Sequence, residues 1–342
     1  MMVAALGIAL PEVRRAFQLS EVEAGSSFSV MMIVAAVTSG IAGRLADKFG
    51  RKRVLITGLS LLALGFGLAG ISGHRILFFF FLALTGIGYG FTPPSLYAVM
   101  SDLLPNRRGL GASLVSVSYG IGGAVGAVLA SRVTATFGWR AAFITVGGIA
   151  AADMLLQLFW IPNNPRTKSS AHSGSFKDAL TLPILILALA ECIGGAVFWS
   201  SAAWTPTLLR TAKMLTLQET GWVMGVLSMA NMFGSFCLGG LSDRFGRRQV
   251  IVSSAFPAAV AAFVVFYWLE SALWISLGIF VFGMFKASVP ALVVALAQEA
   301  APPDNAGTAS ADIVLAMILT TAVPLIVYGS LIGGMRVRAS AV

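Results

Sequence analysis

Apolar runs alternate along the chain with short polar or charged stretches. A helix needs about 20 apolar residues to cross the hydrocarbon core of a bilayer. Runs that reach or approach this length predict ten membrane helices, five on each side of a long polar segment. They occupy residues 25–43, 54–71, 76–100, 109–133, 139–161, 181–203, 220–240, 250–268, 273–298 and 308–332. A further apolar run, at residues 1–10, is too short to span.

The long polar segment covers residues 163–178, NNPRTKSSAHSGSFKD. Ser, Pro and Lys are frequent in it and no apolar period runs through it, which is typical of a linker. We therefore expect an N-terminal half at residues 1–162, a linker at 163–180 and a C-terminal half at 181–342.

Composition agrees with a membrane protein. The chain is 57% hydrophobic and 11% charged, with a mean hydropathy of +0.88, whereas soluble domains carry roughly 25% charged residues. A soluble globule is therefore excluded. The net charge of +9 does not indicate a nucleic-acid partner, because the basic residues lie in short loops between apolar runs, as in membrane proteins.

Neither the cysteines nor the histidines suggest a metal site. Cys192 and Cys237 lie in separate apolar runs and are expected to be small buried hydrophobic residues. His74 and His172 lie in loops and have no partner at ligand spacing. We expect no metal and no cofactor.

Two charged loops, one in each half, carry nearly the same sequence. Residues 43–53 read GRLADKFGRKR and residues 239–248 read GGLSDRFGRR, at an offset of 243 − 47 = 196 residues. The same offset aligns LSEVEAG at 19–25 with LTLQETG at 215–221, and Pro94 with Pro290. A repeat of this length indicates a duplicated, pseudo-symmetric membrane protein.

The two loops resemble the signature loop of the major facilitator superfamily and its weaker copy in the second half. The resemblance implies an all-α polytopic fold of two six-helix halves. By the offset, the counterpart of helix 181–203 would start at 181 − 196 = −15, and that of helix 139–161 would end at 161 + 196 = 357. We therefore expect about ten complete helices, the end of helix one and the start of helix twelve, in a chain that is a fragment or a mis-started and prematurely ended reading frame.

The resemblance also assigns a gating motif, which consists of the glycines, acids and first arginine of each loop: Gly43, Asp47, Gly50, Arg51, Gly239, Asp243, Gly246 and Arg247. Asp47 would face the start of the helix near Thr308 and Asp243 that of the helix near Gly109, where a helix N-terminus favours negative charge. These contacts would hold the inner end closed.

Counting Lys and Arg predicts the orientation. Loops on the side of the signature loops and linker hold 13 of the 23, the other side holds 9, and Lys286 lies within a span. By the positive-inside rule, we expect the signature loops in the cytoplasm and the chain in the inner or plasma membrane.

Glu191 and Lys286 are charged residues well inside predicted spans, where an ionised group costs about 2.5–3.5 kcal/mol on insertion scales. Glu191 and Lys286 would both lie deep in the membrane, at roughly 15 Å and 17 Å from the inner side. They are candidates for a substrate or proton site. The alternative is a structural ion pair that only neutralises itself, or two residues that do not meet.

Several uncharged side chains complete the candidate site. Tyr119 and Asn231 lie in the middle of their spans as possible hydrogen-bonding groups of a cavity, and Trp199 offers a surface for a ligand to stack on. Trp204, near the end of its helix, is expected to anchor that helix at the membrane interface.

One apolar span carries a glycine repeat followed by two prolines. The glycines of GIGYG, residues 86–90, are expected to allow close helix packing. Pro93 and Pro94 are expected to break or bend the span.

These features predict a secondary active transporter that moves a small solute, an organic anion, by alternating access with a proton or another ion. Its partners would be the solute, the coupling ion and the bilayer, and the chain would be a monomer. The alternatives are drug or metabolite efflux by proton antiport, and a receptor of the same fold that transports nothing. GIGGAVG, residues 120–126, lies where exporters of the family that the loops resemble carry a Gly-Pro motif. The proline is missing here, so the resemblance favours uptake over efflux. No catalytic set converges, so no enzyme is expected.

Overall fold

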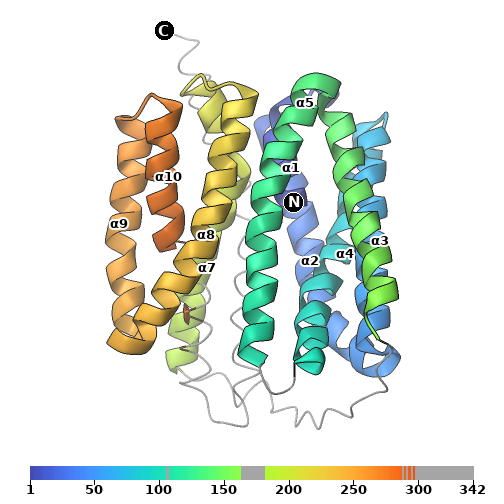
Figure 1. The fold of residues 1–342 in the computed structure, drawn as a ribbon. Helices are drawn as coiled ribbons and strands as arrows, with labels where there is room; N and C mark the ends of the chain where they lie inside the picture. Colours follow the sequence, from blue (N-terminus) through green and yellow to red (C-terminus); the bar gives the residue numbers. More distant parts are fainter. Residues whose placement is uncertain (105–107, 163–181, 287–288, 290–291, 294–295, 297–342) are drawn as a thin grey trace.

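The computed structural model describes residues 1–104, 108–162, 182–286, 289, 292–293 and 296. The elements assigned in this part of the chain are all helices, drawn in Figure 1. They are α1 (Met2–Phe17), α2 (Glu21–Phe49), α3 (Arg51–Ile71), α4 (Arg75–Leu103), α5 (Arg108–Trp160), α7 (Leu182–Thr211), α8 (Leu217–Phe245), α9 (Arg247–Tyr267) and α10 (Ala272–Lys286).

The helices follow the apolar runs but extend beyond most of them, because charged helix ends remain helical outside the apolar part. Within the described residues, six helices are long and apolar enough to cross a membrane. The predicted helices 109–133 and 139–161 both lie in α5, which Gly138 interrupts with a φ of +82°. The predicted helix 308–332 lies outside the described residues, and 273–298 is described only in part.

The 196-residue repeat is confirmed at the helix boundaries. Adding 196 to the bounds of α2 (21 and 49) gives those of α8 (217 and 245), and adding it to those of α3 (51 and 71) gives those of α9 (247 and 267). The helix starts are capped alike, because Ser20 forms a capping box with Glu23 and Thr216 forms one with Glu219. The duplicated sequence therefore folds into duplicated local structure.

A single glycine joins the helices in each signature loop. Gly50 separates α2 from α3 with a φ of +97°, and Gly246 separates α8 from α9 with a φ of +92°. Side chains strongly disfavour this region of backbone space, whereas glycine enters it freely. The glycines thus permit a turn with no further loop residue.

Close packing of the N-terminal helices depends on the glycines of α4. A Cβ on Gly86 would lie 2.5 Å from the carbonyl oxygen of Met31 in α2, and one on Gly88 would lie 2.5 Å from that of Gly58 in α3. This confirms that GIGYG serves helix packing. Pro93 and Pro94 do not break the span, because α4 continues as a helix through both; a bend of the span there stays a prediction.

The two halves meet along α5 and α8, which lie side by side in Figure 1. A Cβ on Gly120 would lie 2.9 Å from Cβ of Met232, and one on Gly123 would lie 2.8 Å from Oγ of Ser228. Residue numbers rise along α5 as they fall along α8, so the helices are antiparallel. The glycines of GIGGAVG thus bring the halves together.

The bundle has two ends. The signature end carries the turns at Gly50 and Gly246, and the distal end carries the loops at residues 18–20 and 212–216. In Figure 1 the α8–α9 turn is at the bottom and the bend of α5 at the top. This arrangement places the C-terminal ends of α1 and α7 and the N-terminal end of α2 together at the distal end.

Candidate functional site

An ion pair connects the two halves at the distal end. Nη1 of Arg210, in the last turn of α7, lies 2.5 Å from Oε1 of Glu12 in α1. The side chains are 18% and 21% exposed, so the pair is largely removed from solvent. Removing one partner of a buried pair costs more than removing both, because it leaves an uncompensated charge. Loss of either charge would therefore leave the other uncompensated at the contact between α1 and α7.

A second ion pair lies beside the first, within the N-terminal half. Nη1 of Arg14 in α1 lies 2.6 Å from Oε1 of Glu21 in α2, and Nε of Arg14 donates to the carbonyl oxygen of Leu19 at 3.2 Å. These bonds fix the turn between α1 and α2. The sequence analysis missed all four charged residues of the two ion pairs.

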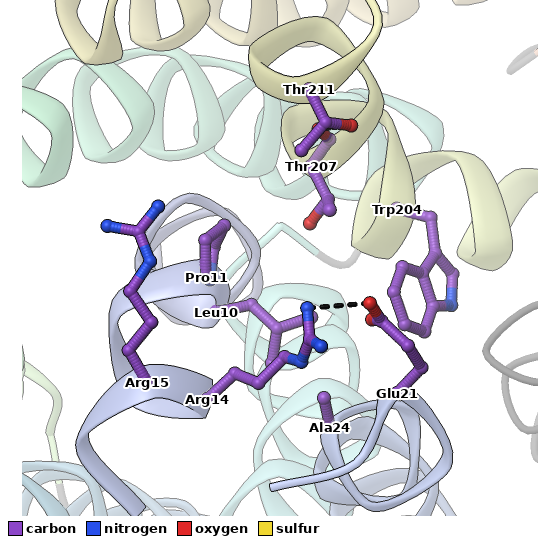
Figure 2. A pocket seen from close by; sticks show the side chains of 9 residues that line it. All are labelled: Leu10, Pro11, Arg14, Arg15, Glu21, Ala24, Trp204, Thr207 and Thr211. Carbon is purple, nitrogen blue, oxygen red and sulfur yellow. Dashed lines mark hydrogen bonds and ion pairs between the residues drawn. The ribbon is translucent and has the colours of Figure 1, made fainter. Parts of the chain in front are cut away.

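A pocket of about 70 Å³ opens next to these ion pairs. Figure 2 shows its side chains, which come from three helices and both halves. It is lined by Leu10, Pro11, Arg14 and Arg15 of α1, Glu21 and Ala24 of α2, and Trp204, Thr207 and Thr211 of α7.

The predicted role of Trp204 as an interfacial anchor is wrong. Its side chain is 1% exposed and forms part of the pocket wall. The reason is that α1 covers this part of α7: a Cβ on Gly7 would lie 3.0 Å from the carbonyl oxygen of Ala202 and 3.6 Å from that of Ala203. The Trp204 side chain therefore packs inside the protein instead of lying at the membrane–water interface.

Tyr119 and Asn231 are brought to the same level of the α5–α8 contact. Each is the sequence neighbour of one member of the Gly120–Met232 contact. Tyr119 is exposed, and Oδ1 of Asn231 is buried without a hydrogen-bond partner in the described part of the chain. Trp199, on α7, packs against the main apolar core. The structure thus places the first two residues on the two helices that contact each other, whereas Trp199 lies on another helix.

The predicted Glu191–Lys286 pair is not tested. Glu191 lies on α7, but its side chain is outside the described residues. Lys286 is the last residue of α10 and is half-buried.

The signature loops are described in part. Nη1 of Arg51 donates to the carbonyl oxygen of Ala98 in α4 at 3.1 Å, which fixes the start of α3 against α4. Oδ1 of Asp243 lies 3.9 Å from Nη2 of Arg247, one turn along the chain, and its side chain is 74% exposed.

The predicted contacts of the acids with opposite helix starts stay a prediction. The surroundings of Gly43 and Gly109 and the side chain of Asp47 are outside the described part of the chain. Thr308 lies outside it altogether. Gly239 lies within α8, where an added Cβ would meet nothing within 4 Å.

A chain with two matching sets of helices and several apolar spans is a multi-pass membrane protein built from a duplicated bundle. A sequence profile described as Major Facilitator Superfamily matches residues 1–322. The chain belongs to this family.

Individual relatives agree with the assignment. The 3-(3-hydroxy-phenyl)propionate transporter of Escherichia coli K12 is 30% identical over 86% of this chain and 73% of its own length. The 4-hydroxybenzoate transporter of Acinetobacter baylyi is 23% identical over 77% of this chain and 66% of its own. The chain spans between 61% and 73% of the length of five curated relatives.

The fold is also that of solved transporters. The crystal structure of a bacterial homologue of the human lysosomal transporter Spinster has a TM-score of 0.81 at 14% identity, over 99% of this chain and 82% of that one.

Proposed function

We propose that this protein is a secondary active transporter that moves a small organic anion across the cell membrane by alternating access. The observation that carries the proposal is the Glu12–Arg210 pair. It joins α1 of one half to α7 of the other at the distal end, and any rocking of the halves that opens this end must separate it. A contact that is well formed but can be replaced by water suits a reversible closure.

The substrate class rests on charge and on the relatives. Arginines of both halves gather at the distal end, and Arg15 lines a pocket there. Lys286 at the end of α10 offers a cation for the carboxylate of a solute. Two relatives bear the names of transporters of hydroxylated aromatic acids. An aromatic monocarboxylate is therefore the substrate class that we favour.

The solute would pass between the halves along α5 and α8. Tyr119 and Asn231, at the same level of that contact, would offer hydrogen bonds, and Trp199 an apolar surface. Glu191 would bind and release the coupling proton, since an intramembrane acid is suited to this task. Uptake that is independent of pH, and unaltered by Glu191→Gln, would count against the last role.

The orientation and the second closure complete the proposal. The signature loops and the linker at 163–180 would lie in the cytoplasm, so that the distal end faces outward. Asp47 and Asp243 would hold the signature end closed against helix starts of the opposite half. The halves would be residues 1–162 and 181–342, the chain would act as a monomer, and it would catalyse no chemical reaction.

Uptake by proteoliposomes tests the function. The chain is reconstituted and given labelled 4-hydroxybenzoate with an imposed proton gradient. We expect accumulation that a protonophore abolishes. Binding without accumulation would instead favour the receptor. Accumulation that requires a proton gradient directed out of the vesicles would favour efflux by proton antiport. Labelled xylose serves as a neutral control solute, which we expect not to be accumulated.

A further inference from the structure

Thr207 contributes a buried hydroxyl to the lining of the distal pocket. Thr207 is 5% exposed, and its Oγ1 has no hydrogen-bond partner in the described part of the chain. Thr211, one turn later, donates to the carbonyl oxygen of Thr207 at 2.8 Å, as is usual for a helical threonine. In Figure 2 the hydroxyl of Thr207 points into the pocket, towards the side of Arg14 and Glu21. A buried polar group without a partner calls for a water molecule or a ligand.

The charges around the pocket favour an anion. Arg14 and Glu21 neutralise one another at 2.6 Å, which leaves Arg15 as a surplus positive charge on the pocket lining. Arg15 forms no ion pair with any residue that the structure describes, and its side chain is exposed. Arg14 itself uses two of its five donors, for Glu21 and for the carbonyl oxygen of Leu19.

Size and position restrict the ligand. The pocket volume of about 70 Å³ is several times the roughly 10–15 Å³ that one water needs by the same measure, so the pocket can admit a carboxylate group. Arg15 and Thr211 are exposed, so the pocket opens beside them and the rest of a solute can remain outside.

We infer that the pocket is a peripheral subsite for the carboxylate group of an organic acid, distinct from the pathway between α5 and α8. Thr207 donates its hydroxyl proton to one carboxylate oxygen, Arg15 supplies the surplus positive charge, and Arg14 offers N–H donors that its bonds to Glu21 and Leu19 leave over. Because Thr207 belongs to α7 and both arginines to α1, the ligand bridges the two halves. The subsite rests on the proposed function only in the choice of an organic acid as ligand.

Binding of 4-fluorobenzoate to the full chain in lipid nanodiscs tests the inference, with ¹⁹F line broadening as the measurement. We expect Thr207→Val to weaken binding about tenfold, which corresponds to the loss of one hydrogen bond to a charged group. Arg15→Gln should weaken it about threefold, as for an exposed ion pair. Neutral 4-fluorobenzamide should bind much more weakly than the acid.

Matched controls separate a site from general effects. Thr134, on α5, is also 5% exposed and its Oγ1 also lacks a partner among the described residues, so Thr134→Val should leave binding unchanged. Arg132→Gln removes an exposed arginine of α5 and should also have no effect. The inference is wrong if the Thr207→Val variant binds 4-fluorobenzoate like the parent, in which case the pocket holds water only. It is also wrong if Arg132→Gln and Arg15→Gln weaken binding equally, or if the amide binds as well as the acid.

The same titration distinguishes the two proposals. If Lys286→Gln alone abolishes binding, the peripheral subsite is wrong and the proposed transport of organic acids stands. If Thr207→Val weakens binding although proteoliposomes accumulate no aromatic acid, the subsite stands and the proposed function is wrong.

Discussion

Arg14 and Arg210 occupy the same position of the repeat, 196 residues apart, yet both pair with acids of the N-terminal half. Arg14 binds Glu21 within its own half, whereas Arg210 reaches from α7 to Glu12 of α1. The counterparts of the two acids are Leu217 and Leu208. The repeat is therefore asymmetric at these two acidic positions. Of the two equivalent arginines, Arg210 is the one that connects the halves.

Neutralising either partner of this connection should open the distal end. In a background without Cys192 and Cys237, Ala203→Cys reports access, because Ala203 is buried where α7 meets α1. We expect Glu12→Gln or Arg210→Gln to raise the rate of labelling by an impermeant thiol reagent about tenfold, since a half-buried pair loses about 1–3 kcal/mol, less than a fully buried one. The exchange Glu12→Arg with Arg210→Glu should restore slow labelling; unchanged labelling in both single variants would contradict the prediction.

Adding a methyl group to Gly88 should destabilise the fold. Its Cβ would lie 2.5 Å from the carbonyl oxygen of Gly58, and backbone cannot move aside as a flexible side chain can. We expect Gly88→Ala to cost about 1–3 kcal/mol and to lower the melting temperature in detergent, measured by fluorescence-detected size exclusion. Gly148→Ala is the control, because its Cβ would meet nothing within 4 Å; equal melting temperatures for the two variants would contradict the packing argument.

The turn glycines of the two signature loops should be equally sensitive to substitution. Gly50 and Gly246 have φ values of +97° and +92°, in a region that side chains rarely adopt and where one costs about 1–3 kcal/mol. We therefore expect Gly50→Ala and Gly246→Ala to lower the melting temperature by similar amounts and to add in the double variant. Gly239→Ala, in a helix and in open space, should not lower it. A large difference between the two turn variants would show that contacts outweigh backbone strain.

The charge of Lys286 should matter for uptake of organic acids. If the lysine neutralises the solute carboxylate, Lys286→Gln should reduce the initial rate of 4-hydroxybenzoate uptake by about tenfold or more, as expected when one member of a charged pair is removed. Lys286→Arg keeps the charge and should retain more of the rate. The measurement is uptake by proteoliposomes at matched protein content, and equal rates for the Gln and Arg variants would contradict the role of the charge.

The helices and the repeat could be predicted because they depend on local sequence. Capping residues such as Ser20 and Thr216, and turn glycines such as Gly50, act within a few residues of where they stand. The same signals recur at a fixed offset, so the ends of α2 and α8 agree. The apolar runs 109–133 and 139–161 were also informative at α5, because Gly138, with its non-helical backbone, separates two helical limbs there (Figure 1).

The distal pocket and its ion pairs could not be predicted in the same way. Glu12 and Arg210 are 198 residues apart, and their contact depends on how α1 packs against α7. The same packing buries Trp204, which its place near a helix end suggested to be interfacial. A signal was nevertheless present, since Arg14 and Arg210 align at the repeat offset near the ends of apolar runs.

The turn at Gly50 leaves only one non-helical residue between α2 and α3, and Gly246 does the same between α8 and α9. A connection this short has no slack, so tilting one helix of a pair must carry the other with it. We therefore expect the two helices of each pair, joined by one glycine, to move together. Relative motion is accordingly expected at the contact between α5 and α8 rather than at these two turns.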